Sequence, residues 1–412
     1  MLFGRSIVIC REGWYYLLVL AFVVTGSFLR EVNLLLVLAG MMLFPLLLNL
    51  RSVMVSTRGL TVRRRVPELV SAGDTFGVEV TLEKHPARGF FGSGASRAVV
   101  AEDQVCWHGG DEACAKAPPL LFWRLKPGQQ QRQSYRCRLG QRGLYQLGPM
   151  KLVSGYPLGL VRGIRQDQRK DRLVVLPRPG RLTQAWARLY QEVHFGSRAS
   201  HRKHGLLEGD FHSLRDWRSG DSHRRIHWRT TARRGSPVVR QFEQQRDEDL
   251  VLLVDMWHPA APTAGDLEIV ERTVSFAATI VTDICRRGNN RLFLGVSEEN
   301  SEVNGGPASS ALMRELLENL AVATADPADR LAALLARTYD TIPTGMTVII
   351  VSPRSLDVAQ LERDAGLWDN VWRRHHSGRI FTICAAGDQL DDYFLSDTAA
   401  SGSTQRRTTH HT

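Results

Sequence analysis

One segment of this chain, Gly205 to Asp255, holds most of the side chains whose types and spacing could support chemistry. Arg, Asp, His and Trp are closely interspersed in it, and it ends in an apolar run, Leu250 to Val254, typical of a strand covered on both faces. Between Arg178 and Arg246 there are 15 Lys and Arg against 6 Asp and Glu, so this stretch carries nine of the chain's eleven net positive charges. Arg offers bidentate donors to carboxylates and phosphates, so the surplus favours either an ion-pair network or a surface for an acidic partner.

Turn residues divide this segment into short elements. Residues 220–222 predict a turn and a helix cap, residues 224–234 a short helix that ends at Gly235, and residues 237–242 a strand. We expect these elements to supply the residues that bind a partner or form ion pairs between domains. The candidates are Arg215, Asp216, Trp217, Asp221, Arg224, Arg225, Trp228, Arg233 and Arg240.

Three interpretations of the basic segment are open. The first is an ion-pair network between domains, in which Asp210, Asp216 and Asp221 pair with neighbouring arginines. The second is a docking site for an acidic or phosphate-bearing partner. The third, nucleic-acid binding, is not expected, because no recognised DNA- or RNA-binding motif accompanies the charge. Arginine pairs fix geometry as readily as they bind ligands, so the first interpretation is favoured.

Patterns for catalysis and metal binding are weak in this sequence. His223 and His227 are four residues apart, which could place two ligands on one helix face, but no Glu follows as in HExxH. No GxSxG, P-loop or dinucleotide fingerprint is present. The six cysteines form no CxxC pair, so we expect reduced thiols and neither a zinc site nor a disulfide framework. The sequence therefore predicts no catalytic residue, no cofactor and no metal.

The spacing of residues in the basic segment resembles the signature of the domain-of-unknown-function-58 family. The matching residues are Gly209, Phe211, Leu214, Arg215, Gly220, Asp221, Arg224, Arg225, Ile226, Trp228, Ala232, Arg233, Val239 and Arg240, followed by the strand that ends at Asp255. Members are bacterial membrane proteins related to von Willebrand factor A (vWA) domains and usually associated with MoxR-type AAA ATPases, so the resemblance implies such an ATPase as partner. No biochemical activity is established for the family, so the resemblance informs the fold more than the function.

The C-terminal part shows alternating strand and helix patterns. Strands are expected at 250–254, 291–296, 347–351 and 379–385, with helices at 267–287, 311–320 and 329–336, which is the order of a doubly wound α/β domain. The domain resembles a vWA domain, which implies a cation site built from Asp-x-Ser-x-Ser and a later Asp. Here Trp257 and Pro259 replace the two serines, and Arg354 follows the later strand without an Asp. We therefore expect Asp255 to be a helix cap or an ion-pair partner.

Two apolar runs near the start, Trp14 to Leu29 and Val32 to Leu50, predict a transmembrane hairpin. Arginines flank it on both sides, whereas the turn offers only Arg30 beside Glu31, so both ends are expected in the cytoplasm. The flanking arginines are Arg5, Arg11, Arg51, Arg58, Arg63, Arg64 and Arg65. The expected location is the bacterial inner membrane, with the lipid bilayer as one partner and the soluble domains in the cytoplasm.

The middle of the chain consists of short alternating runs separated by Gly and Pro, which predict an antiparallel β-sandwich. The whole is thus a membrane-anchored multidomain protein. Its expected parts are a two-helix transmembrane hairpin (1–56), a β-sandwich-like domain (57–177), the signature segment (178–247), a vWA-like α/β domain (248–396) and a disordered tail (397–412). The leading hypothesis is a non-enzymatic scaffold or adaptor. The alternatives are a metal-dependent hydrolase that uses Asp255 with nearby histidines, and a nucleic-acid-binding protein.

Overall fold

The computed structural model describes most of the chain, with gaps. The described residues are 5–30, 33–86, 94–108, 114–201, 210–218, 221–223, 226–243, 249–288, 290–299, 302–342, 346–366 and 380–396. They form two compact units, one of Met1–Arg178 with Glu318–Val322 and the other of Pro179–Leu317 with Ala323–Thr412. The predicted tail, 397–412, lies outside the described residues, and the predicted domain limits stay predictions.

The first unit contains two long apolar helices, α1 (Arg11–Arg30) and α2 (Asn33–Thr57). Most of their large apolar side chains are exposed: Phe22 is 81% exposed and Phe44 67%. Crossing a bilayer takes about 20 predominantly apolar residues. Both helices are long and apolar enough to cross a membrane, in agreement with the two predicted spans.

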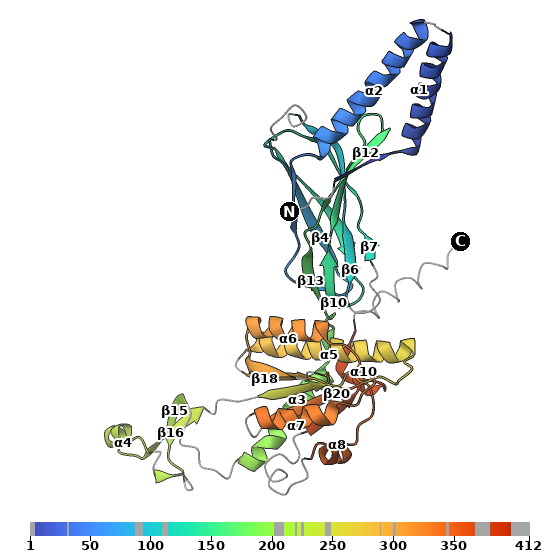
Figure 1. Ribbon diagram of the computed structural model, residues 1–412. Helices are drawn as coiled ribbons and strands as arrows, with labels where there is room; N and C mark the ends of the chain where they lie inside the picture. Colours follow the sequence, from blue (N-terminus) through green and yellow to red (C-terminus); the bar gives the residue numbers. More distant parts are fainter. Residues whose placement is uncertain are drawn as a thin grey trace, which may run out of the picture. The chain divides into compact units, whose positions relative to one another are not determined.

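Both ends of this helix pair join the same β structure. β1 (Arg5–Ile9) directly precedes α1 and pairs antiparallel with β12 (Val161–Asp167). At the other end, α2 is followed after a short turn by β2 (Leu60–Arg65). Figure 1 shows the two helices leaving the strands at one end of the unit.

The last turns of α2 are part of the β unit, so the helix is longer than its predicted apolar run, which ends at Leu50. Asn49 is fully buried; its amide donates to the Gly155 carbonyl at 3.2 Å and its side-chain oxygen accepts from the Val161 amide at 3.0 Å. The buried Lys84 ammonium donates to the carbonyls of Val55 and Arg58, both at 2.7 Å. Lys84 thereby satisfies carbonyls that the end of a helix leaves without partners.

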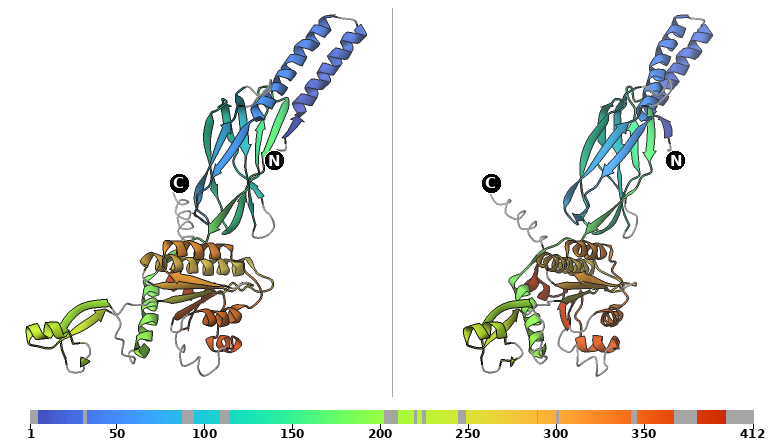
Figure 2. Two further views of the ribbon diagram at one scale, coloured as in Figure 1. Left: turned by 60° about the vertical axis from the view of Figure 1, so that its left-hand side comes forward. Right: turned by 90° about the vertical axis from the view of Figure 1, so that its left-hand side faces the viewer.

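The strands of the first unit form three sheets around one core (Figure 2). The first sheet has the order β1, β12, β11 (Met150–Ser154), β5 (Ser96–Glu102), β8 (Leu120–Leu125). The second has the order β3 (Val70–Ser71), β13 (Asp171–Leu176), β10 (Gly143–Leu147), β6 (Gln104–Trp107), β7 (Cys114–Lys116). The third has the order β2, β4 (Thr75–Lys84), β9 (Gln130–Arg138). Alternate residues of these strands point inward, as in β4, where Val78, Val80 and Leu82 are completely buried.

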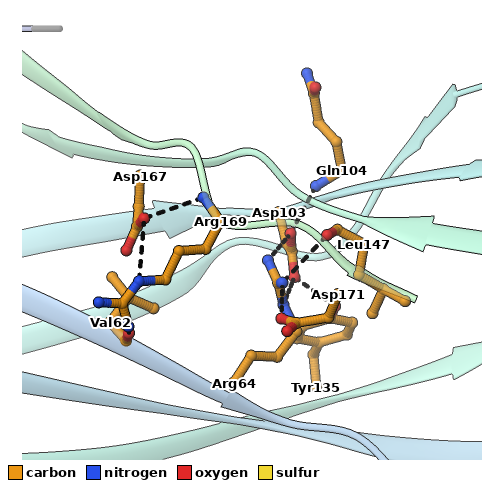
Figure 3. A network of polar contacts seen from close by, with 9 residues as sticks. All are labelled: Val62, Arg64, Asp103, Gln104, Tyr135, Leu147, Asp167, Arg169 and Asp171. Carbon is orange, nitrogen blue, oxygen red and sulfur yellow. Dashed lines mark hydrogen bonds and ion pairs between the residues drawn. The ribbon is translucent and has the colours of Figure 1, made fainter. Parts of the chain in front are cut away.

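A buried ion-pair network joins these sheets (Figure 3). Arg64 on β2 makes two hydrogen bonds to Asp103, at 2.9 and 2.7 Å, and a third to Asp171 at the start of β13. The Tyr135 hydroxyl of β9 donates to Asp103 at 2.8 Å. The Arg64 side chain is only 3% exposed. The Arg64 charge is therefore paired inside the β unit, although the sequence placed Arg64 among the arginines that flank the transmembrane hairpin.

The structure pairs two cysteines for which the sequence predicted no disulfide. Cys106 on β6 and Cys114 on β7 lie directly opposite each other in an antiparallel pair, with their Cα atoms 4.1 Å apart, and form a disulfide. The register between two short strands brings these side chains together. They are eight positions apart in the sequence, which gave no sign that both belong to one hairpin.

The second unit is built on a five-stranded sheet. Its order is β19 (Val303–Pro307), β18 (Arg291–Val296), β17 (Leu250–Val254), β20 (Thr347–Ser352), β21 (Ile380–Cys384). The four strands that the sequence predicts are present and parallel, and β19 adds an antiparallel edge. Every residue of β17 and β20 is buried, because helices cover both faces.

Figure 1 shows α5 (Ala264–Arg287) and α7 (Leu331–Thr341) on opposite faces of this sheet. The α7 face is filled by a core that includes Val251, Leu253 and Leu334. α5 begins with a capping box in which Thr263 and Asp266 bond each other's backbone amides. The remaining helices of this part include α6 (Ser310–Val322) and α8 (Val358–Asp364).

Part of the predicted signature segment belongs to the α/β unit. β14 (Arg181–Leu182) pairs with β22 (Phe394–Leu395), and α3 (Gln184–His201) follows it. Trp186 on α3 is 2% exposed, and its ring meets the Phe276 ring of α5 edge-on at 5.4 Å. The segment before the basic signature is therefore anchored in the α/β core.

Candidate functional site

Polar side chains meet at the carboxyl edge of the parallel sheet. Asp255 directly follows β17, Ser297 directly follows β18, and Ser352 is the last residue of β20. The strands are in register, with Val254 opposite both Val296 and Val351, so the three residues arrive at the same edge. In open α/β sheets this edge is where ligands bind.

Asp255 is completely buried and accepts hydrogen bonds on both carboxylate oxygens. The Ser297 hydroxyl donates to one oxygen at 3.2 Å and the Ser352 hydroxyl to the other at 2.9 Å. The Trp257 amide adds a bond at 3.3 Å. A buried charge persists when it is hydrogen-bonded and paired with an opposite charge. The bonds above supply the first condition for Asp255, and Arg354 supplies the second.

Arg354 provides the positive charge of this edge. Its Nε donates to Asp255 at 3.2 Å, and another guanidinium nitrogen donates to Asp329 at 2.7 Å. The guanidinium lies over the Trp257 ring, 4.6 Å from the ring centre. About a quarter of the Arg354 side chain is exposed. The prediction that Asp255 is an ion-pair partner is confirmed, and Arg354 is the partner that the sequence did not identify.

The electrostatics of this pair follow from its burial. Burial raises the pKa of the Asp255 carboxyl above its ordinary value, while Arg354 and Ser352 act in the opposite direction. Burial alone would lower the pKa of Arg354, but its bonds with Asp329 and Asp255 outweigh that and raise the pKa. The Asp255 carboxylate and the Arg354 guanidinium therefore stabilise each other's charged form, because burial removes water that would otherwise do so.

The residues at this edge do not fit a divalent cation. Such an ion needs several oxygen ligands from converging loops. Here the guanidinium of Arg354 already lies against Asp255, and Trp257 stands where the vWA pattern has a serine. In the described part of the chain, no three His, Cys, Asp or Glu side chains gather closely enough to hold a metal. The positive charge beside Asp255 is the guanidinium of Arg354.

The basic signature forms a small hairpin. β15 (Asp210–Asp216) pairs antiparallel with β16 (Val238–Glu243), and α4 (Trp228–Arg234) lies between them in sequence. Val238, Val239 and Ile226 are buried and give the hairpin its apolar interior.

Arg215 and Asp221, two of the predicted residues, are brought together. Two guanidinium nitrogens of Arg215 donate to the two carboxylate oxygens of Asp221, each at 2.7 Å. The Arg218 amide also donates to Asp221, at 2.9 Å. The hydrogen bonds from Arg215 and from this amide lower the pKa of Asp221 below its ordinary value. The pair closes the loop that follows β15.

The helix of the signature is shorter than predicted. It begins at Trp228, because His227 acts as its N-cap and accepts from the Thr230 amide, and it ends at Gly235, which has a positive φ of 72° as the sequence suggested. His227 is thus outside the helix, where its Nδ1 accepts from the Thr230 amide, and it does not share a helix face with His223. Arg224 and Arg225, predicted within the helix, lie outside the described residues.

The remaining predicted residues are spread over the hairpin. Asp216 is 3.7 Å from Arg234, with both side chains mostly exposed, and the Trp217 ring is 5.9 Å from the His223 ring. Arg240 is exposed on β16, opposite Leu214. The exposed residues of α4 are Trp228, Arg229, Ala232, Arg233 and Arg234. Trp228 is 67% exposed, so it does not serve as interior packing.

The comparison with protein families finds a match that lies almost wholly in the second unit. Residues 213–350 match the model of "Protein of unknown function DUF58", which confirms the family resemblance read from the basic signature. The match covers the hairpin and most of the parallel sheet.

A relative of this class is "Uncharacterized protein YeaD" of Bacillus subtilis (strain 168). It is 28% identical over 266 residues, which are 63% of this chain and 61% of the relative. The alignment therefore spans less than two thirds of that protein.

Two of the solved structures that the chain resembles each match 28% of it. The CARDB domain of PF1109 from Pyrococcus furiosus matches with 13% identity over 94% of its own length and a TM-score of 0.20. A superoxide reductase (neelaredoxin) from Ignicoccus hospitalis matches with 17% identity over 80% of its length and a TM-score of 0.19. No argument rests on matches at this level.

Proposed function

We propose that this protein is a membrane-anchored scaffold or adaptor whose α/β unit and basic hairpin bind another protein. The partner that the family resemblance implies is a MoxR-type AAA ATPase. In this proposal α1 and α2 span the bacterial inner membrane, both ends of the hairpin are cytoplasmic, and the α/β unit is a vWA-like interaction module.

The observation that carries the proposal is the exposed surface of α4. Trp228 is 67% exposed and is followed on the same short helix by Arg229, Arg233 and Arg234, with no acidic residue among its seven. Trp and Arg are the residue types that most often dominate binding energy at protein interfaces. An indole flanked by guanidinium groups suits an acidic partner surface with an apolar pocket.

The carboxyl edge of the sheet supports the same interpretation. Asp255, Ser297, Ser352 and Arg354 satisfy one another there, so the edge has a fixed polar structure of its own. Among the described residues, the hydrogen-bond partners of Asp255 include no histidine, so the hydrolase alternative gains no support from this geometry.

The orientation is supported by charge and connectivity. Arginines flank the helix pair, and its two ends are attached to one β structure, which requires them to lie on the same side of a bilayer. The arginine bias favours the cytoplasmic side.

Co-purification tests the proposed docking surface. The full chain is purified from membranes of cells that also produce the MoxR-type AAA ATPase of the same genome. Changing Trp228→Ser together with Arg233→Glu is expected to lower ATPase recovery about tenfold or more, as loss of an interface anchor does. Leu267→Ser on α5, another exposed apolar residue, is the matched control and is expected to leave recovery unchanged. Equal recovery with the double variant would contradict the assignment of α4 as the docking surface.

A further inference from the structure

An exposed apolar and aromatic patch lies on the first unit, outside the helices. Leu121 and Trp123 of the edge strand β8 are 51% and 65% exposed, while the alternate residues Leu120 and Phe122 face the core. Leu158, in the loop between β11 and β12, is 51% exposed. Side chains of this size are seldom left in water as a group without a binding role.

These side chains form one surface together with a tyrosine and an arginine. The Trp123 and Tyr156 rings meet edge-on with centroids 6.5 Å apart. The Arg97 guanidinium lies over the Tyr156 ring, 5.6 Å from its centre. Arg124 and Arg162 are exposed nearby in sequence and register, so the aromatic surface has a basic border.

The loop that carries Tyr156 and Leu158 is attached to the bases of both long helices. The buried Asn49 amide of α2 donates to the Gly155 carbonyl. At the other end of the loop, the Leu160 carbonyl accepts from the Cys10 amide at 3.0 Å, just before α1 begins. Gly13 packs against that same carbonyl, where an added Cβ would come within 2.2 Å. These bonds place the loop, and Tyr156 with it, at the end of the β unit where the helices begin and end. Figure 2 shows the two helices leaving that end.

Tryptophan, tyrosine and arginine are the side chains that favour the membrane interface. Indole and phenol rings place an apolar body at the headgroup level and keep a polar tip in water. Arginines near the surface are attracted to anionic headgroups. The headgroup region on each side of the hydrocarbon core is several ångströms deep, enough to cover a loop at the helix base and a ring next to it.

We propose that Trp123, Tyr156 and Leu158, bordered by Arg97, rest in the headgroup layer of an anionic bilayer and hold the β unit against the membrane. The inference rests on the proposed function in one respect, because it requires α1 and α2 to span the bilayer. The β unit is then a part of the membrane-binding surface and is not merely a spacer behind the helices.

Photocrosslinking of the full chain in lipid nanodiscs tests this proposal. A benzophenone amino acid replaces Trp123 in one variant and Leu158 in a second, so that one misfolded variant does not decide the outcome. The same group at Phe44 of α2 reports on the spans. At Leu69, which is 50% exposed beyond the far end of β2, it serves as the matched negative control. Crosslinks to lipid are read by mass spectrometry in nanodiscs of phosphatidylcholine with or without phosphatidylglycerol.

We expect positions 123 and 158 to crosslink to lipid at least about fivefold more than position 69, as residues of an interfacial belt should. The yield should rise with phosphatidylglycerol, and Arg97→Gln should reduce that rise. Crosslinking at 44 without crosslinking at 123 and 158 would overturn the inference while the spans stand. Failure at position 44 would overturn the proposed spans, and the inference with them.

Discussion

At the scale of single residues, the positive charge at the carboxyl edge of the parallel sheet comes from the guanidinium of Arg354. Arg354 lies against Asp255, and its other end is paired with Asp329. Removing one partner of a buried pair leaves the other charge without compensation, which costs far more than the pair contributes. Removing Arg354 should therefore lower stability more than removing an ordinary surface arginine.

Changing Arg354→Ala is expected to lower the local stability of the sheet by about 2–3 kcal/mol, because Asp255 stays buried without its cation. Hydrogen exchange of the β17 and β20 amides in the full chain measures the change. The matched control is Arg330→Ala, which removes a partly exposed i,i+4 pair with Asp326 and should cost under about 1 kcal/mol. Equal effects of the two substitutions would contradict the account.

The Arg215 and Asp221 pair makes the hairpin loop sensitive to acid. An aspartate whose pKa is lower in the folded than in the unfolded chain adds stability above its unfolded pKa, and that stability is lost as the pH falls through the folded pKa. Because the pKa of Asp221 is lowered, protection of the Arg218 amide should persist at neutral pH and disappear only below the ordinary range of aspartate. Exchange rates corrected for their intrinsic pH dependence measure this. In Arg215→Gln the loss should move to higher pH, and an unchanged profile would rule the pair out as its cause.

At the scale of elements, the Arg64 network ties β2 and β9 of the third sheet to β13 of the second and to Asp103, which lies between β5 and β6. Arg64→Met should destabilise the β unit by about 3 kcal/mol or more, because Asp103 is then buried without its cation. The neighbouring Arg63 is exposed, and Arg63→Met should change stability by no more than about 0.5 kcal/mol. Denaturation of the full chain in nanodiscs, followed by exchange in β2 and β4, compares them. Similar losses for both would show that Arg64 acts only as surface charge.

The elements also show what the sequence could and could not predict. The parallel strands of the α/β unit were predictable, because a short continuous apolar run such as Leu250 to Val254 is typical of a strand covered on both faces. The start of α4 was not, since His227 is a rare helix cap and the charge pattern continues through it. The antiparallel edge strand β19 escaped prediction because Val303 to Pro307 has little apolar character.

In the candidate site, contacts between residues close in sequence were easier to predict than contacts made by strand register. The pair of Arg215 and Asp221 is close in sequence and followed from composition and turn chemistry. Arg354 lies 99 residues from Asp255, and only the register of three parallel strands brings them together. The disulfide of Cys106 and Cys114 depended on a strand pairing of the same kind.

At the scale of the whole molecule, the proposed cytoplasmic orientation predicts the redox state of Cys106 and Cys114. Disulfides are rare in the cytosol, where glutathione and thioredoxin keep thiols reduced. If the β unit is cytoplasmic, Cys106 and Cys114 should be thiols in intact cells and should join on oxidation after lysis. Trapping with a membrane-permeant alkylating reagent before lysis, followed by mass spectrometry, gives the fraction oxidised. Cys384 of the other unit, a partly exposed free cysteine, is the internal control for labelling. A fully formed disulfide in trapped cells would place the β unit in an oxidising compartment and overturn the orientation.

The proposed scaffold role of the whole molecule requires that the basic hairpin binds a partner. The most direct measurement is a titration of the purified full chain, held in nanodiscs, with the purified MoxR-type AAA ATPase. The account predicts saturable binding that weakens as salt rises, is lowered at least about tenfold by Trp228→Ser with Arg233→Glu, and is unchanged by Leu267→Ser. No binding by the native chain, or equal affinity for the native chain and the double variant, would contradict it.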